Sequence, residues 1–381
     1  MSTIFDYLVQ AEFSLAAYAN LSTGVPKQDE LIKAGMSADQ AAQFAATYSV
    51  VAQYSDSATG LSATVFADAA GNRYLAIRGT QPSLSDLTAD YLLASGIPAS
   101  LNPQFSALKA EMDIWLADPN VLQGKSFTVT GHSLGGYLAA AVAQEYGAQV
   151  TDAYLFNSPG MYGVLGTIAD SFMNFFGLSG TPVGNIWNIQ GSSGLSIISG
   201  LGDQLGQAVT IQTDAAPGLG TNNHSIVRLN NSLAVYNLFA ELDPTLNSSP
   251  GIQTISDILQ ASTNQTNRTL ENALDALRIL FNAPNASTPT PTDNNNQFYQ
   301  NLTDLQSTLN NVLVAHNTGT TTQPNYNLTV RDLSVMFNTL GSAQIASIAQ
   351  SNLAYSYALV NLNSFAVTGN DAIYTQFDTT N

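Results

Sequence analysis

Helical and strand-like patterns alternate over the first 244 residues. Apolar positions recur at helical spacing near residues 4–20 and over 38–54 and 104–117. Short runs of β-branched and aromatic residues stand between and after them, over 63–67, 74–77, 127–130, 153–156 and 186–190. Strands that alternate with helices in this way are typical of parallel sheets. We therefore predict an α/β fold with a largely parallel central sheet, whose first two strands are joined by a turn at Gly71–Asn72.

The pattern changes at about residue 245, where Asn, Thr, Ser and Gln become frequent. Residues 282–296 read NAPNASTPTPTDNNN, which predicts an exposed, flexible loop. Leucines at helical spacing flank this loop, and a further helix is expected over 345–358. We therefore predict two domains, a catalytic α/β domain over residues 1–244 and a mainly helical, Asn/Thr-rich extension over residues 245–381.

The chain is acidic and poor in charged residues. Lys and Arg total 10 and Asp and Glu total 27, so the formal net charge is −17. Charged residues make up 10% of the chain, against about 25% in an average globular protein. Phosphate backbones would repel such a chain, so nucleic-acid binding is disfavoured and not expected as its function. The absence of cysteine excludes disulfides, thiolate metal sites and a cysteine nucleophile.

The same features bear on location. Residues 1–10 lack a basic region and carry Asp6, so a Sec-type signal is not expected. No run approaches the ~18 apolar residues that span a bilayer. A cysteine-free, lysine-poor, acidic chain suits export in the unfolded state. We expect a secreted protein without a Sec-type signal, and a cytoplasmic location stays open.

The most informative motif is the pentapeptide GHSLG at residues 131–135. A strand-like run, FTVT, precedes it and a helix-forming run, YLAAAVA, follows it over 137–143. This is the context of a nucleophile elbow, a tight turn in which side chains at both glycines would collide with the neighbouring strand and helix. Ser133 is then the nucleophile, and the Leu134 N–H points at the developing oxyanion. The alternative is a chance glycine-rich turn in a chain with 28 glycines.

A serine nucleophile needs a base, and the chain has three histidines. His132 lies inside the elbow. His316 lies beyond the Asn-rich loop and would have to reach over the site from the extension. His224 lies in a polar loop after the last candidate strand, and it alone fits the order Ser, acid, His within one domain. We predict His224 as the base, with a surface loop histidine as the alternative.

The acid of the triad lies between Ser133 and His224, where the chain has four aspartates. Asp203 follows the strand at 186–190 in a glycine-rich loop and is favoured, although the connection before it is long. Asp214 follows the apolar run at 209–213 and is the competing candidate. The other two, Asp152 and Asp170, are placed less well.

A second oxyanion donor is expected after an earlier strand. The sequence Arg78-Gly79-Thr80 follows the strand that ends at Ile77. Thr80 could offer both its backbone N–H and its hydroxyl to the oxyanion. The alternative is an ordinary β-turn with glycine in a strained position.

Taken together, these segments resemble the class 3 lipase family. The resemblance is carried by AIRGT at 76–80, Asp90, TGHSLGG at 130–136 and FNSPG at 156–160, and it covers about residues 60–240. It implies an α/β-hydrolase fold and cleavage of carboxylic esters of lipids. It also implies Ser133 as nucleophile, His224 as base, and Thr80 with Leu134 as the oxyanion hole. The Asp-x-[Val/Ile]-Pro context of the family's acid is absent here, so the resemblance assigns no acid.

The tail adds to the resemblance. Residues 357–359 and 363–367 are similar to segments beside such lipase domains in large secreted bacterial proteins. This similarity implies the catalytic region of a secreted bacterial lipase-like protein, and whether the chain is a fragment of a longer one stays open.

Two segments are candidates for a lid or an acyl-binding wall, residues 81–105 and the apolar stretch 161–181. We interpret the chain as a serine carboxylic-ester hydrolase of the lipase type that needs no cofactor. Its substrate is a lipid or other hydrophobic ester, met in solution or at a lipid–water interface. A short-chain esterase, a phospholipase A1, a polyester hydrolase and a non-catalytic surface or binding module on a hydrolase scaffold stay open, as do acyl length, head group and oligomeric state.

Overall fold

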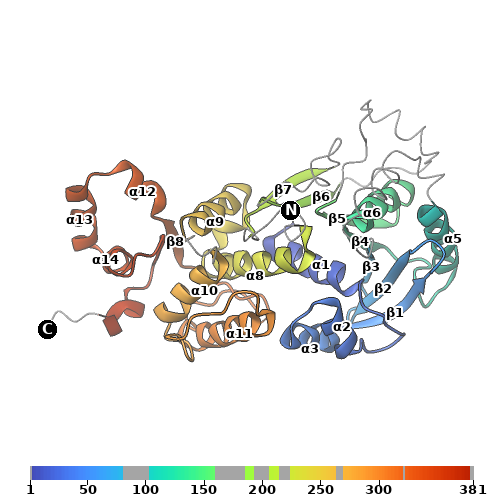
Figure 1. The fold of residues 1–381 in the computed structure, drawn as a ribbon, viewed down its shortest axis with the longest axis horizontal. Coiled ribbons are helices and arrows are strands. Elements are labelled where there is room, and N and C mark those ends of the chain that lie inside the picture. The colour runs from blue at the N-terminus through green and yellow to red at the C-terminus, as the bar shows by residue number, and fades with distance from the viewer. Residues whose placement is uncertain are drawn as a thin grey trace. The chain divides into compact units, whose positions relative to one another are not determined.

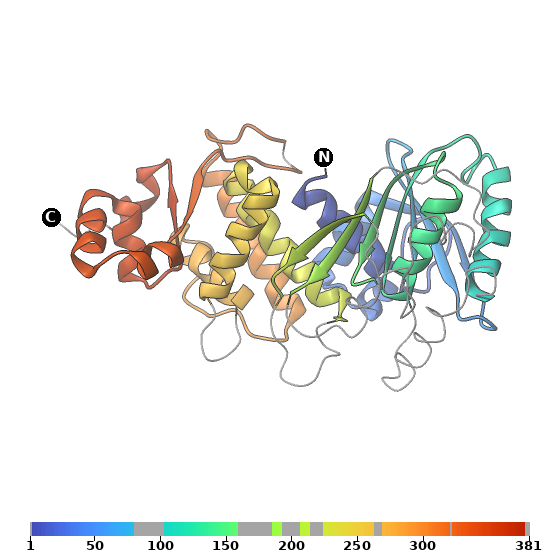
Figure 2. The same ribbon diagram turned by 90° about the horizontal axis from the view of Figure 1, so that it is seen from above.

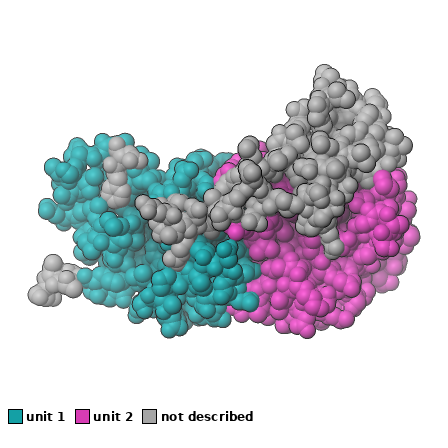
Figure 3. Space-filling model, in the orientation of Figure 1, with its two compact units in different colours: residues 1–8, 211–216, 231–381 teal, residues 9–210, 217–230 magenta. Residues whose placement is uncertain are grey.

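The computed structural model describes residues 2–79, 103–158, 185–192, 206–213, 224–262, 269–320 and 322–377. The chain forms two compact units, coloured separately in Figure 3. The sheet unit comprises residues 9–210 and 217–230, and the helical unit comprises residues 1–8, 211–216 and 231–381. The domain division at residue 244 stays a prediction.

Seven strands form one sheet and follow one another across it in chain order (Figures 1 and 2). They are β1 (Tyr48–Ser55), β2 (Ser62–Asp68), β3 (Arg73–Ile77), β4 (Phe127–His132), β5 (Val150–Phe156), β6 (Ile186–Gly191) and β7 (Gln207–Ile211). The pairs β1–β2 and β2–β3 are antiparallel, and the pairs β3–β4, β4–β5 and β5–β6 are parallel. The predicted α/β class with a largely parallel sheet is confirmed, as is the hairpin that turns at Gly71–Asn72.

The helix predicted over 38–54 ends early. A capping box between Ser37 and Gln40 starts α3 (Ala38–Thr47), which follows the short α2 (Gln28–Ala34). From Tyr48 the chain is β1, so the prediction is wrong after Thr47. The cause is pairing with distant segments, because β1 runs along β2 and Val50 exchanges two backbone hydrogen bonds with Gly24. Apolar residues there fit either period, and tertiary pairing decided between them.

One face of the sheet carries a hydrophobic core. Alternate residues of the strands point to opposite faces, and the odd-numbered ones contribute Leu75, Ile77, Val129 and Leu155 to this core. Two crossover helices complete it, α5 (Pro103–Ala117) and α6 (Leu134–Glu145). Sequential parallel strands with crossovers of one hand place their helices on one face. Strand β4, which leads into the GHSLG motif, is therefore packed between β3 and β5 and against α6.

The N-terminal helix α1 (Ile4–Ala16) packs on the opposite face of the sheet. The Phe13 ring stacks on Tyr74 of β3 with centroids 4.4 Å apart. The Ser14 hydroxyl lies 2.7 Å from the Thr130 hydroxyl on β4, which also donates to the Gln10 carbonyl. These contacts hold the C-terminal half of α1 against β3 and against β4, the strand that leads into the GHSLG motif.

The helical unit is mainly α-helical, as predicted for the extension, and α8 contributes residues to both units. Its helices are α8 (Ile226–Leu242), α9 (Ser249–Ser262), α10 (Thr269–Leu280), α11 (Asn295–Val312), α12 (Ser334–Thr339), α13 (Ser342–Ser351) and α14 (Leu353–Val360), with short 3-10 helices η3 (Pro244–Asn247) and η4 (Asp371–Phe377). A small antiparallel pair, β8 (Thr329–Asp332) and β9 (Phe365–Thr368), joins them. The helix predicted over 345–358 is interrupted at Asn352, which caps α14. Among the described helices, none has the length and apolarity needed to cross a membrane.

The Asn/Pro-rich loop between α10 and α11 is tied to α10. Arg278 is buried and donates to the carbonyls of Asn285 and Thr288, both at 3.0 Å. The same guanidinium pairs with Asp275 at 2.8 Å, and Asp275 accepts the Thr290 N–H. Most of the loop is exposed, as predicted. Its main chain at residues 285, 288 and 290 is held by side chains of one helix.

Candidate active site

The turn between β4 and α6 has the backbone of a strained elbow. Ser133 has φ 59° and ψ −130°, a conformation that non-glycine residues rarely adopt. Its N–H donates to the Phe156 carbonyl on β5, and its carbonyl accepts from the N–H of Gly136. Such strain persists only where the surroundings enforce it, and it is concentrated at functional sites.

The Ser133 side chain is kept out of the usual role of a serine at this position. A serine that precedes a helix ordinarily caps it by accepting a hydrogen bond from the first turn. Within the described part of the chain, the Ser133 hydroxyl makes no such capping bond to α6. The residue is 6% exposed, so the hydroxyl is held in a nearly closed site.

The glycines of the motif are required by contact with main chain. A methyl group on Gly131 would overlap the carbonyl of Gly135, and one on Gly135 would overlap the Ile77 carbonyl on β3. On Gly136 it would lie 2.7 Å from the Ser158 Cβ. The predicted collision with neighbouring helix and strand is confirmed. The helix thus begins directly against β3, and its first residue, Leu134, offers one of the N–H groups left without a helical partner at a helix start.

The chain after β3 also lies against the elbow. A methyl group on Gly79 would be 2.5 Å from the His132 carbonyl oxygen and 3.1 Å from the Ser133 Cβ. The next residue, Thr80, lies outside the described residues. The contact of Gly79 with the elbow is consistent with the role predicted for Thr80 as an oxyanion donor, which stays a prediction.

His224 lies near the elbow. It stands between β7 and α8, it is 8% exposed, and its ring centroid is 4.8 Å from that of His132. Burial lowers its pKa to about 4. The ring is therefore neutral at neutral pH and able to accept a proton. Ser133, Leu134 and His224 thus belong to one buried region of the sheet unit.

Other predicted site residues cannot be placed in the same way. Asp203 falls between β6 and β7, and Asp214 between β7 and His224, and both lie outside the described residues. The same is true of the candidate lid segments 81–105, apart from the first residues of α5, and 161–181. The third histidine, His316, is in the helical unit, with its Nε2 3.1 Å from the Asn370 amide nitrogen.

Two described residues of this region are not among the predicted site residues. The Tyr18 hydroxyl lies 3.0 Å from His132 Nδ1. Asn157 has φ 43°, accepts the Gly191 N–H at 2.9 Å, and donates to the His224 carbonyl at 3.5 Å. Asn157 carried a signal, because it stands in the FNSPG motif and asparagine tolerates the left-handed conformation. Tyr18 carried none, since an aromatic residue at the end of an amphipathic helix indicates core packing.

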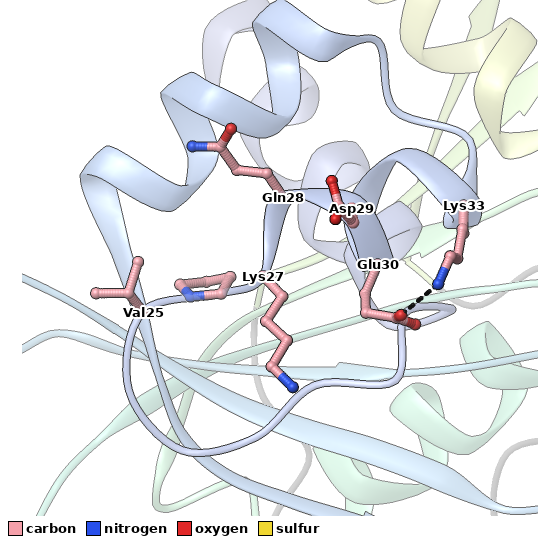
Figure 4. A pocket seen from close by; sticks show the side chains of 7 residues that line it. Val25, Lys27, Gln28, Asp29, Glu30 and Lys33 are labelled. Atoms are coloured by element: carbon pink, nitrogen blue, oxygen red, sulfur yellow. Dashed lines mark hydrogen bonds and ion pairs between the residues drawn. The ribbon is translucent and has the colours of Figure 1, made fainter.

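Two further observations concern other candidate sites. Within the described ranges, no group of three or more His, Asp or Glu side chains could hold a metal ion. A surface hollow beside α2 is lined by Val25, Pro26, Lys27, Gln28, Asp29, Glu30 and Lys33 (Figure 4). These seven residues include an exposed Lys33–Glu30 ion pair at 2.7 Å but neither serine nor histidine. The buried elbow is therefore the better candidate for catalysis.

Comparison with solved structures finds lipases of fungi. Lipase II from Rhizopus niveus matches with 14% identity and a TM-score of 0.32, covering 50% of this chain and 72% of its own. The lipase from Rhizopus microsporus var. chinensis matches with 15% identity and a TM-score of 0.34, covering 59% and 83%. A triacylglycerol lipase from Penicillium expansum matches with 15% identity and a TM-score of 0.35, covering 56% and 82%. No protein-family model and no curated protein matches the sequence.

Proposed function

We propose that this chain is a serine carboxylic-ester hydrolase of the lipase type. The observation that carries the proposal is the conformation of Ser133, a strained, nearly buried residue at the start of α6 whose hydroxyl does not cap the helix. A strand, a sharp turn and a helix that together withhold a serine from structural use form a nucleophile elbow. The nearby buried His224 supports the proposal because a serine requires a base.

The proposed reaction has two halves. His224 takes the proton of Ser133 as its Oγ attacks the ester carbonyl carbon, and the oxyanion is held by the N–H of Leu134 and by Thr80. The tetrahedral intermediate collapses, and the alcohol leaves with the proton held by His224. Water, deprotonated by His224, then attacks the acyl-enzyme and releases the carboxylate, and the proton returns to Ser133. The mechanism requires no cofactor.

The acid of the triad has a defined task in this proposal. Burial disfavours the charged ring of His224, whereas the reaction passes through that charged ring. A carboxylate at His224 stabilises the imidazolium and orients it. We assign this task to Asp203, with Asp214 as the alternative. Comparing Asp203→Asn with Asp214→Asn decides between them, because only loss of the true acid removes most of kcat.

The substrate class follows from charge and apolarity. The net charge of −17 disfavours anionic interfaces and helps to expel a carboxylate product. The apolar candidate wall at 161–181 favours an ester with a hydrophobic acyl group. A lipid or other hydrophobic ester is therefore the proposed substrate.

The test is hydrolysis of p-nitrophenyl esters from acetate to palmitate, above and below the concentration at which they form interfaces. Ser133→Ala is the matched control, and a fluorophosphonate probe reports labelling of Ser133. Serine-dependent activity that rises with chain length and at interfaces supports a lipase. Activity on short soluble esters alone indicates an esterase, and activity only on phospholipids or polyesters indicates those enzymes. Absence of labelling and of serine-dependent hydrolysis would overturn the proposal in favour of a binding module.

A further inference from the structure

The imidazole of His132 connects two segments of the sheet unit. Its Nε2 lies 2.6 Å from the main-chain carbonyl oxygen of His224, and its Nδ1 lies 3.0 Å from the Tyr18 hydroxyl. A carbonyl oxygen can only accept, so Nε2 carries the proton of the neutral ring. Nδ1 is then an acceptor, and the Tyr18 hydroxyl donates to it. The two contacts therefore specify a single tautomer.

The protonation states agree with this assignment. Burial, reinforced by the nearby His224 ring, holds the pKa of His132 well below its usual value, so the ring is neutral at neutral pH. Burial also raises the pKa of Tyr18 well above its usual value, so its hydroxyl keeps its proton. The Gly79 main chain hydrogen-bonds to the same hydroxyl. The resulting chain runs from Gly79 through Tyr18 and His132 to the His224 carbonyl.

This chain, which we call the His132 bridge, joins the parts that the proposed reaction uses. Gly79 precedes the candidate oxyanion donor, His132 precedes the candidate nucleophile, and His224 is the candidate base. The bond to His224 is short and is made to its main chain, which leaves the ring to exchange protons. Asn157 adds a second, longer donor to the same carbonyl at 3.5 Å.

We propose that His132 is a positioning residue, which through its Nε2–H fixes the main chain of His224 and so holds the base beside Ser133. Tyr18 supports it by selecting the tautomer that has this donor. The inference rests on the proposed function of Ser133 and His224. During turnover the His224 ring alternates between neutral and charged forms, and a loop without a fixed carbonyl would move with each change. A misplacement of about 1 Å costs about 100-fold in rate.

Two substitutions separate the donor from the bulk of the ring. The amide nitrogen of Gln in His132→Gln reaches the place of Nε2 and keeps a donor for the His224 carbonyl. The shorter amide in His132→Asn reaches only the place of Nδ1 and keeps a partner for Tyr18. We expect His132→Asn to lower kcat about 100-fold with little change in KM. His132→Gln is expected to recover most of that loss. Equal losses in the two folded variants, or an unchanged kcat in His132→Asn, would overturn the inference.

Tyr18→Phe tests the tautomer without altering the histidine. Loss of the hydroxyl removes one of the two contacts that select the tautomer, so part of the population carries its proton on Nδ1 and loses the bond to the His224 carbonyl. We expect kcat to fall by up to about tenfold, the equivalent of one net hydrogen bond. Tyr74→Phe, which removes a hydroxyl bonded to Asp68, is the matched control and should not change kcat. Thermal unfolding verifies that each variant is folded. If His132→Asn fails to fold, the comparison of Tyr18→Phe with Tyr74→Phe tests the inference instead. Equal activity of these two variants would contradict it.

A spectroscopic reading separates this inference from the proposed function. With three histidines in the chain, the ¹⁵N spectrum of the imidazoles resolves His132 by comparison with His132→Gln. We expect a protonated Nε2 and an unprotonated Nδ1 at neutral pH, in the wild type and in Ser133→Ala alike, and a mixture of tautomers in Tyr18→Phe. Protonated Nδ1 in the wild type would overturn the inference even if esters are hydrolysed. The expected tautomer without serine-dependent hydrolysis would overturn only the proposed function and, with it, the catalytic role of the bridge.

Discussion

The elbow at residues 131–136 and the loop between α10 and α11 are both irregular, but they are restrained in opposite ways. In the elbow, main chain packs against main chain, and Gly135 leaves no room for a single methyl group beside the Ile77 carbonyl. In the loop, exposed main chain is tied down by two side chains, Arg278 and Asp275. The restraint on the elbow can be recognised in the sequence from glycines at fixed spacing. The restraint on the loop depends on two charged side chains, which bind main-chain groups further along the chain.

The largest effect is expected where main chain meets main chain. Gly135→Ala forces β3 and α6 apart, and such overpacking should cost at least about 3 kcal/mol of unfolding free energy. Urea unfolding measures it, and hydrolysis should be lost with it. Gly341→Ala is the control, because its nearest neighbour would be 3.7 Å away. Equal stability of the two variants would mean that the elbow can accommodate a methyl group at residue 135, against the close contacts in the structure.

The side-chain restraint should be nearly as costly to break. Arg278→Met leaves Asp275 largely buried without its cation, at an expected cost of about 3 kcal/mol. Limited proteolysis should then cut between residues 281 and 294, while kcat for esters is retained in the folded fraction. Lys33→Met removes an exposed ion pair and should change stability by less than about 1 kcal/mol. An uncut loop in Arg278→Met would show that Arg278 is not its anchor.

The helical unit holds a buried carboxyl, Glu241, that should make its stability depend on pH. Glu241 is buried among Asn237 and Gln306, and burial raises its pKa from 4.5 to about 7. The folded state therefore binds this proton more tightly than the unfolded chain, and stability falls as pH rises from about 4.5 to 7. Glu241→Gln should match the wild type near pH 4 and exceed it by about 3 kcal/mol at pH 8. Urea unfolding at both pH values tests this, and a wild type that gains stability over that window relative to the variant would contradict it.

The smallest effect measures strain at the elbow. Glycine adopts the backbone of Ser133 without penalty, so Ser133→Gly should be more stable than Ser133→Ala by about 1 kcal/mol. Both variants should be inactive, which separates stability from catalysis. Denaturant titration of the two proteins side by side gives the difference. If Ser133→Ala proves the more stable, the left-handed backbone at this position is not strained.

The parts of the fold that were predictable are those set by local pattern. The hairpin at Gly71–Asn72 and the passage from β4 into α6 need only a turn, a strand and a helix in sequence. The boundary between α3 and β1 was mispredicted because Tyr48 and Val51 fit a helical period as well as a strand. Pairing with β2 settled their structure, and that information lies elsewhere in the chain.

The candidate site divides in the same way. Ser133 follows from five consecutive residues, and His224 follows from the chain order of a triad with few histidines available. Tyr18 could not be found, since its partner His132 is 114 positions away and only folding brings them together. The choice between Asp203 and Asp214 also depends on long-range placement, which spacing does not encode.

The close contact between Gly135 and β3 limits where insertions and deletions can occur in this chain. In the parallel register, Ile77 lies opposite Gly131, and α6 starts directly on the residues that follow. Lengthening the hairpin turn near residue 71 would leave the contact between Gly135 and Ile77 intact. Inserting one residue between 73 and 79 would move a different peptide group under the helix and carry Gly79 away from the elbow. Homologues and engineered versions should therefore gain or lose residues at the hairpin and keep the distance from β3 to residue 79 constant.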